Sequence, residues 1–229
     1  MENKLTFLGH AAFALETGGY QILIDPFLSR NPQASLSAEI VPADFILVTH
    51  GHADHLGDTV SIAKRTGALV ISTSEIGDWL EEQQVKTHSQ SLGGGFHHPF
   101  GYLKLTYALH GAGLDGVPHG CGGNPAGLLL TCLDGTKFYH AGDTGLFGDM
   151  RLIGEERLDV ACLPIGDNYT MGPADALRAV KLLQPKVVIP MHYSREGLLR
   201  QDPEAWKSQV EQETATKVRI LNPGESISF

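Results

Sequence analysis

The chain is poor in cysteine and lacks any long apolar run. Its 229 residues include three cysteines, Cys121, Cys132 and Cys162. An odd number at wide spacing does not build a disulfide framework, so we expect free thiols and a reducing compartment. No apolar stretch reaches the roughly 18–20 residues of a membrane-spanning helix. The first residues also do not combine basic side chains with an apolar core, so we see no signal peptide. We therefore expect a cytoplasmic protein without a membrane partner.

Positive charge is also scarce. The chain has 17 lysines and arginines against 26 aspartates and glutamates, a formal net charge of −9. This balance disfavours a general phosphate-binding surface, so we expect a small-molecule substrate rather than nucleic acid. The content of 42% hydrophobic and 19% charged residues is ordinary for a globular protein. The length allows one domain over residues 1–229, and a homo-oligomer is compatible with it.

What the chain does have is a dense group of metal-ligand side chains directly after an apolar run. The run is 45–48, and the group is His50-Gly51-His52-Ala53-Asp54-His55. Side chains two apart on an extended segment point to the same side, so His50 and His52 can share one ion. Asp54 and His55 lie where the chain turns into a helix, and their side chains can diverge from the first pair. The spacing indicates two neighbouring ions rather than one structural zinc, which more typically uses cysteine.

Further candidate ligands share one position in the pattern. His110, Asp143 and His192 each come shortly after an apolar strand-like run. Catalytic groups collect at the carboxyl ends of strands in α/β sheets, which favours a functional role for these three. His140 and Asp167 have similar positions, but two ions can be bound without them.

The remaining pattern predicts strands early in the chain and alternating strands and helices later. The expected strands include 20–24, 69–71, 102–108, 128–132, 137–140, 160–163 and 187–190, and the expected late helices are 173–183 and 203–213. Two packed sheets with helices on the outside would accommodate both halves.

Four segments read as loops that shape the substrate pocket, namely 26–44, 87–101, 111–127 and 193–202. His97 and His98 are metal-ligand types, but the glycine and proline around them predict a solvated loop. His119 lies in a glycine-rich segment and is expected to line the substrate entrance.

The ordered motifs resemble the metallo-β-lactamase superfamily. The segment His50-x-His52-x-Asp54-His55 is its signature. The details resemble the UlaG-like branch, in particular the UPF0173 group of metal-dependent hydrolases. The motifs that carry this likeness include Gly9-His10-Ala11, Ile24-Asp25-Pro26-Phe27, Tyr139-His140-Ala141-Gly142-Asp143-Thr144, Leu163-Pro164-Ile165-Gly166, Thr170-Met171-Gly172-Pro173 and Ile189-Pro190-Met191-His192-Tyr193. The resemblance implies an α/β fold, a four-layer αββα sandwich of two mixed sheets with helices on the outer faces.

The resemblance also assigns roles to residues by position. It implies that one metal is bound by His50, His52 and His110, a second by Asp54, His55 and His192, and that Asp143 bridges both. Asp25 matches an aspartate that supports the ligand loop. His10, His140 and Tyr193 are candidates for supporting the ligands or contacting substrate. The chain departs from the group at Gly111, where serine is common after the histidine ligand.

The expected chemistry follows from two neighbouring divalent ions. Such ions lie about 3.5–4 Å apart and lower the pKa of a shared water to about 7. We expect the bridging hydroxide to cleave an ester, lactone, amide or phosphoester bond, with Asp54 and Asp143 as the catalytic carboxylates. Tyr193, His140 and a metal-bound water remain alternatives for protonating the leaving group. The ligand mixture suits zinc, which we expect, and also manganese, iron or nickel.

Two other functions fit the same ligands. The superfamily includes RNA and nucleotide phosphodiesterases, although the acidic charge balance counts against such a substrate. A non-catalytic module that binds a ligand through the metals is the other alternative. The retained Asp143 counts against it.

Overall fold

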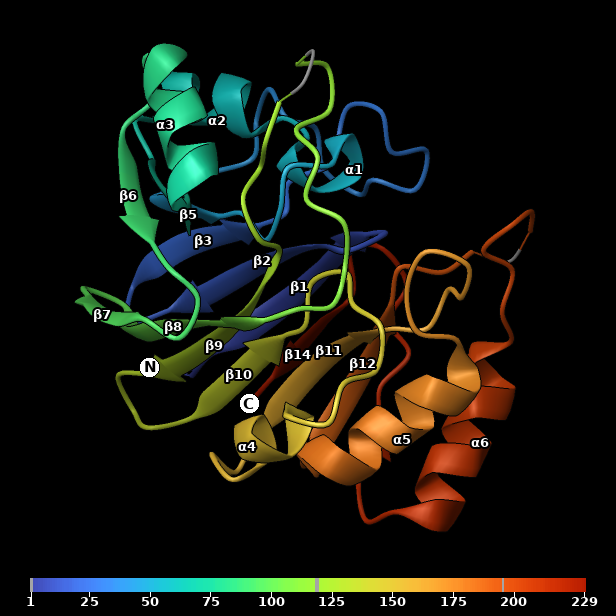
Figure 1. Cartoon of the computed structure of the whole chain (residues 1–229). Helices are drawn as coiled ribbons and strands as arrows, with labels where there is room; N and C mark the ends of the chain where they lie inside the picture. The colour runs from blue at the N-terminus through green and yellow to red at the C-terminus, as the bar shows by residue number, and fades with distance from the viewer. Residues whose placement is uncertain (1, 118–119, 195) are drawn as a thin grey trace.

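Two seven-stranded mixed sheets face each other in the computed structural model, which describes residues 2–117, 120–194 and 196–229 (Figure 1). His119, predicted to line the substrate entrance, lies outside the described residues. The first sheet has the order β14-β1-β2-β3-β4-β5-β6, with bounds β1 (Lys4–Gly9), β2 (Ala12–Thr17), β3 (Tyr20–Ile24), β4 (Phe45–Leu47), β5 (Leu69–Thr73), β6 (Thr87–Gln90) and β14 (Ser226–Ser228). The second has the order β13-β12-β11-β10-β9-β8-β7, with bounds β7 (Gly95–His98), β8 (Gly101–Tyr107), β9 (Ala126–Cys132), β10 (Lys137–His140), β11 (Val160–Pro164), β12 (Val187–Met191) and β13 (Lys217–Val218).

Strand direction places several carboxyl ends together. In the first sheet, β3, β4, β5 and β6 are parallel neighbours, and β1 runs the same way because β2 is antiparallel to both β1 and β3. In the second sheet, β10, β11, β12 and β13 are parallel, and β8 shares their direction through antiparallel β9. Loops that leave these strands at their carboxyl ends therefore meet along one edge of each sheet.

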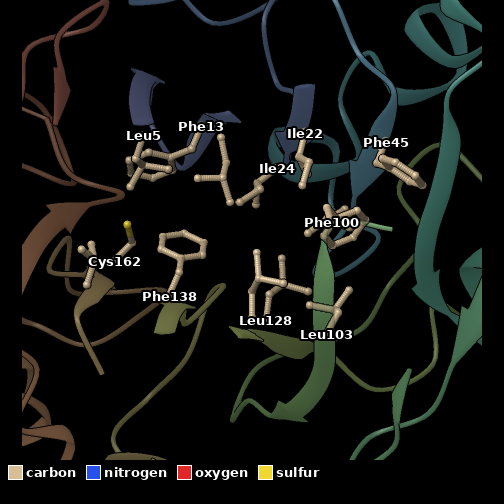
Figure 2. Packing of buried hydrophobic residues seen from close by; sticks show 14 of the residues in the cluster. Leu5, Phe13, Ile22, Ile24, Phe45, Phe100, Leu103, Leu128, Phe138 and Cys162 are labelled. Atoms are coloured by element: carbon tan, nitrogen blue, oxygen red, sulfur yellow. The ribbon is translucent and has the colours of Figure 1, made fainter. Parts of the chain in front are cut away.

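The main apolar core fills the space between the sheets. Figure 2 shows Leu5, Phe13 and Ile22 of the first sheet facing side chains such as Leu128 and Phe138 of the second. All five are at most 1% exposed, because alternate residues of each strand point inward. Burial of a side chain of this size contributes roughly 1.5–3 kcal/mol, so this layer holds the two sheets together.

Helices cover both outer faces and complete four layers (Figure 1). The helices are α1 (Ala53–Leu56), α2 (Thr59–Thr66), α3 (Ser74–Glu82), α4 (Met150–Gly154), α5 (Pro173–Leu183) and α6 (Pro203–Glu213). Ile62 and Leu80 of α2 and α3 belong to the apolar cluster on the outer face of the first sheet. Val180 and Trp206 of α5 and α6 belong to the corresponding cluster of the second. The predicted αββα sandwich is confirmed.

Several local predictions were confirmed. Both late helices occupy the predicted residues, each beginning with a proline in its first turn, where the missing N–H is harmless. Asp202 caps α6, and its side chain accepts the backbone N–H groups of Glu204 and Ala205. The three cysteines are free, as expected, and Cys132 and Cys162 are buried. No helix in the described part of the chain is long and apolar enough to cross a membrane.

The prediction of a loop over 87–101 was wrong. This segment contains the edge strands β6 and β7. The ring of His98 is buried rather than solvated, and its Nε2 lies 3.1 Å from Gln90 Oε1 on β6. Edge strands with polar residues lack the apolar alternation that identifies a strand, because their stability comes from pairing with distant segments. The short helix α4 also escaped prediction.

Candidate metal centre

All seven predicted ligands lie in segments that follow the carboxyl ends of strands, and two of them, Asp54 and His55, lie in the short helix α1. The donors come from four places: His50, His52, Asp54 and His55 after β4, His110 after β8, Asp143 after β10, and His192 after β12. These strands run in the same direction within their sheets, so four distant segments converge on one site.

The first group of donors contains three histidines. His52 Nδ1 lies 3.0 Å from His50 Nε2 and 3.2 Å from His110 Nε2. One nitrogen from each ring falls within 4.8 Å of the others. The rings of His50 and His110 stand nearly perpendicular to that of His52, at 79° and 81°. Three imidazole nitrogens that converge in this way can share one ion.

The second group combines one carboxylate with three rings. Asp54 Oδ2 lies 3.1 Å from His10 Nε2 and 3.7 Å from His192 Nε2. His55 completes this group, whose donor atoms also fall within 4.8 Å of one another. Asp54, His55 and His192 are the three residues predicted to share a metal. The structure adds His10 beside them.

Asp143 lies between the two groups. Its Oδ1 is 3.2 Å from His55 Nε2, and its Oδ2 is 3.0 Å from His192 Nε2. The same Oδ2 is 3.6 Å from His110 Nε2, which belongs to the first group. His50, His55 and Asp143 form a third set of mutually close donors. Asp143 therefore occupies the position that a bridging ligand requires.

Several of these close approaches are not hydrogen bonds. Among the described residues, His55 Nε2, Asp143 Oδ1 and both ring nitrogens of His192 are buried without a hydrogen-bond partner. Leaving one such group unsatisfied costs about 1–3 kcal/mol, so a cluster of four calls for an explanation. Buried imidazole and carboxylate donors that converge without bonding to each other fit a divalent cation, and the residues present therefore fit the implied metals.

The charges of the site suit metal binding. Burial opposes ionisation of Asp143, but His55 and His192 outweigh it and hold the pKa of this carboxyl well below its usual range. Burial, reinforced by His55, holds the pKa of His50 well below its ordinary value. At neutral pH the carboxylate is therefore charged and His50 is neutral, which are the forms that bind metal.

The centre of the site favours positive charge. Burial alone would lower the pKa of His192, but Asp143 and Asp54 raise it to about 9. Asp143 and Asp25 likewise raise the pKa of His55 well above its ordinary value, against the effect of burial. The carboxylates thus create a local field that a divalent cation would satisfy.

Asp25 and Thr49 orient two of the rings. Asp25 accepts the backbone N–H of Thr49 at 2.8 Å, the Thr49 hydroxyl at 2.7 Å and His55 Nδ1 at 2.7 Å. Because the Thr49 hydroxyl donates to Asp25, its oxygen can accept from His50 Nδ1, 3.0 Å away. The Nε2 atoms of His50 and His55 are then free to face the site. These hydrogen bonds are of the kind that the supporting role predicted for Asp25 requires.

The other candidate residues occupy different places. His140 is fully buried, and its Nε2 donates to Ala11 O at 3.0 Å while its Nδ1 accepts from Gly142 N at 3.2 Å. Its ring therefore holds the turn that leads to Asp143. Tyr193 is half-buried against the apolar cluster between the second sheet and its helices.

A cavity of about 280 Å³ opens onto the metal centre. Its lining residues are His52, Asp54, His110, Asp115, Asp143, Tyr169 and His192. The sequence reasoning missed Asp115 and Tyr169. Tyr169 comes five residues after the carboxyl end of β11, and the turn through Asp167 and Asn168 brings it to the cavity. Nothing in the sequence distinguishes Asp115 from other loop aspartates.

Comparison with known proteins identifies the family. Residues 4–192 match the family described as the beta-lactamase superfamily domain. The chain belongs to the metallo-β-lactamase superfamily. A UPF0173 metal-dependent hydrolase of Pelotomaculum thermopropionicum is 53% identical over 230 residues, which cover 99% of this chain and 100% of that protein. Another protein of the same name, from Desulforamulus reducens, is 53% identical over 231 residues, with 99% and 100% coverage.

A solved structure also resembles this chain over its whole length. Igni18, described as a novel metallo hydrolase from Ignicoccus hospitalis, matches with a TM-score of 0.91 and 39% sequence identity. The match covers 100% of this chain and 99% of Igni18. The relationship predicted from the ordered motifs is therefore confirmed, and the chain falls in the UPF0173 group.

Proposed function

We propose that this chain is a metal-dependent hydrolase that cleaves an ester, lactone, amide or phosphoester bond in a small molecule. The observation that carries the proposal is the position of Asp143, which lies within 3.6 Å of His55, His110 and His192. One carboxylate placed between two donor groups favours two ions over one. The names of the relatives, all metal-dependent hydrolases, support the same reaction class.

Two metal sites follow from the donor groups. His50, His52 and His110 would hold one ion, Asp54, His55 and His192 the other, and Asp143 would bind both. Five imidazoles and two carboxylates without a thiolate suit zinc, and also manganese or iron. When bound, two such ions supply an attacking water of lowered pKa, about 7, and polarise the bond under attack.

Asp54 is the ligand best placed to orient the attacking water. Its side chain is 40% exposed and lines the cavity, whereas Asp143 is only 3% exposed. Burial opposes its charge, but His10 and His192 hold the pKa of Asp54 well below its ordinary value. A carboxylate that stays ionised accepts a hydrogen bond from water at any working pH. It is better suited to orienting that water than to keeping its proton.

The acidic surroundings favour a small substrate over a nucleic acid. Asp54 and Asp115 line the cavity, and the whole chain carries a net charge of −9. Proteins bind the sugar-phosphate backbone of a nucleic acid through clustered lysine and arginine side chains. Among the described residues, no lysine or arginine lines this cavity. These features support hydrolysis of a small molecule rather than of RNA.

The test combines metal content with turnover. The purified chain, loaded with zinc or manganese, is assayed on panels of esters, lactones, amides and phosphodiesters, beside Asp143→Ala and the control Asp149→Ala. Asp149 is exposed and precedes α4 outside the metal-centre cavity. We expect Asp143→Ala to lower kcat at least about 1000-fold and to lose bound metal, while the control keeps both.

Two outcomes would contradict the proposal. Unchanged turnover in Asp143→Ala would reject the assignment of the site. Full metal loading with no product from any panel would favour the non-catalytic module, and salt-sensitive RNA binding followed by metal-dependent cleavage would favour the phosphodiesterase.

A further inference from the structure

One wall of the metal-centre cavity is an exposed aromatic ring. Tyr169 lines the cavity with five of the proposed metal ligands, and the residue is 58% exposed. No aromatic ring among the described residues packs against it. A single exposed ring is common on protein surfaces, so the surrounding backbone must show whether this one is held in place.

The loop that carries Tyr169 makes a left-handed turn. Asp167 and Asn168 both adopt left-handed conformations, with φ of 64° and 53°. Aspartate and asparagine tolerate this conformation better than other residues except glycine, and here the backbone N–H of Asn168 donates to Asp167 Oδ1 at 2.9 Å. The position of Tyr169 therefore depends on how this turn is restrained.

Backbone hydrogen bonds supply that restraint. Asp167 N donates to Met171 O at 3.1 Å, which closes the loop around Tyr169. Met171 N donates to Thr144 O at 2.9 Å, and Thr144 directly follows the proposed bridging ligand Asp143. The loop is therefore attached to the segment that carries the central carboxylate.

A second attachment links the loop to His192. A Cβ atom on Gly166 would lie 2.1 Å from His192 O, so the loop's first residue packs tightly against this ligand's backbone. Gln201 Nε2 also donates to Gly166 O at 3.2 Å. The loop is thus fixed between two metal ligands, and Tyr169 is presented at the cavity from a rigid base.

We propose that Tyr169 is a substrate-contacting residue whose ring packs against an apolar or planar group of the substrate and positions the scissile bond at the metal centre. This proposal rests on the proposed function. A ring held by its backbone loses little side-chain freedom on binding, because tyrosine has only two side-chain torsions. The contact uses the face of the ring, so phenylalanine should replace tyrosine while serine should not.

The proposal also names a substrate class. The cavity offers one aromatic wall, while Asp54 and Asp115 supply acidic groups. It therefore favours small molecules that carry an aryl or extended apolar group beside the scissile bond. It disfavours substrates with an anionic group away from that bond.

The experiment measures binding, so that it does not depend on turnover. The probes are benzohydroxamic acid and acetohydroxamic acid, which share a metal-binding group and differ in the ring. Calorimetry on the zinc-loaded chain gives the ratio of their Kd values. We expect the ring to increase affinity about threefold to tenfold in the wild type, a range typical of one aromatic contact. Tyr169→Phe should keep this ratio, and Tyr169→Ser should bring it close to one with unchanged zinc content.

Phe96→Ser is the matched control, because it removes another exposed ring, 49% exposed, on the edge strand β7. It should leave the ratio unchanged. The proposal is overturned if Tyr169→Ser keeps the wild-type ratio of the two Kd values. It is also overturned if this ratio falls close to one in Tyr169→Phe. If neither hydroxamate binds the zinc-loaded wild type, this proposal is rejected, whereas the metal centre is tested separately by the zinc content of the chain. If the ratio behaves as expected but no panel compound is hydrolysed, the proposed function alone fails.

Discussion

Asp25 and His55 lie 30 residues apart in the chain, yet Asp25 Oδ2 is 2.7 Å from His55 Nδ1 and both side chains are fully buried. This pair joins the end of β3 to the ligand segment after β4. It also decides which nitrogen of His55 faces the metal centre, because a ring that donates from Nδ1 to a carboxylate presents Nε2 on the opposite side.

Removing the charge of Asp25 should weaken metal binding without removing a ligand. In Asp25→Asn only one side-chain oxygen remains to accept from His55 and Thr49. The ring of His55, and that of His50 behind Thr49, therefore lose their fixed orientation. We expect metal affinity to fall about 10–100-fold, the usual effect of removing such a support. Competition with a chelator of known affinity measures it. Asp44→Asn is the control, since Asp44 is an exposed residue whose carboxylate accepts the backbone N–H of Gln21. Wild-type affinity in Asp25→Asn would show that the pair does not orient a ligand.

Gly57 should be required for the relative placement of the two segments that carry Asp25 and His55. It ends α1 with φ of 45°, and a Cβ there would lie 2.5 Å from Pro26 O and 2.7 Å from Phe27 Cα. Gly57→Ala must therefore displace either α1 or the chain after Asp25. We expect a loss of more than about 3 kcal/mol in the free energy of unfolding, together with weaker metal binding.

Gly67 offers the matched control for backbone strain alone. It has φ of 78°, and a Cβ there would meet no atom within 4 Å. Gly67→Ala should cost about 1–2 kcal/mol, the penalty of a left-handed alanine, and leave metal affinity unchanged. Equal losses of stability in the two variants, measured by urea unfolding, would mean that the contact with Pro26 is easily relieved.

The stability of the protein should depend on pH through His98. Burial, with a smaller contribution from His88, lowers the pKa of His98 to about 4. In the unfolded chain this ring takes up a proton near its ordinary pKa of about 6.5, so between these values the unfolded state binds more protons. The contribution of neutral His98 to the free energy of unfolding is therefore fully present above about pH 6.5 and is lost as the pH falls towards 4.

His98→Gln should remove this dependence. We expect the wild type to lose on the order of 1–2 kcal/mol more than the variant between pH 7 and pH 4.5, a figure reduced for solvent screening. Denaturant unfolding at the two pH values measures the difference. The neighbouring exposed His97 provides the control, and His97→Gln should behave as the wild type does. A variant at position 98 with the wild-type pH dependence would contradict the argument.

The proposed ligands were the residues that the sequence singled out most easily, and the walls of the cavity were the hardest part to predict. The close spacing of His50, His52, Asp54 and His55 identifies them as candidate ligands. Apolar runs show where buried strands end, and this position selects His110, Asp143 and His192. The strands 20–24, 137–140 and 187–190 were predictable for the same reason, since each contains a short apolar run that lies buried in a sheet.

What could not be predicted depends on contacts between distant segments. Only one residue of the edge strand β6, Gln90, is buried, so its sequence carries no apolar period. Pairing with β5 makes this segment a strand. Tyr169 reaches the cavity because two left-handed residues turn the loop, a conformation that neither Asp167 nor Asn168 requires by itself. Asp115 gains its place through the backbone N–H of Ala53, 62 positions earlier in the chain.

Anomalous scattering from crystals of the zinc-loaded chain shows how many ions the site binds and where they lie. We expect two peaks about 3.5–4 Å apart. One should lie among His50, His52 and His110, the other among Asp54, His55 and His192, with Asp143 in contact with both. A single peak at full zinc loading, or two peaks away from Asp143, would contradict the proposed two-ion site.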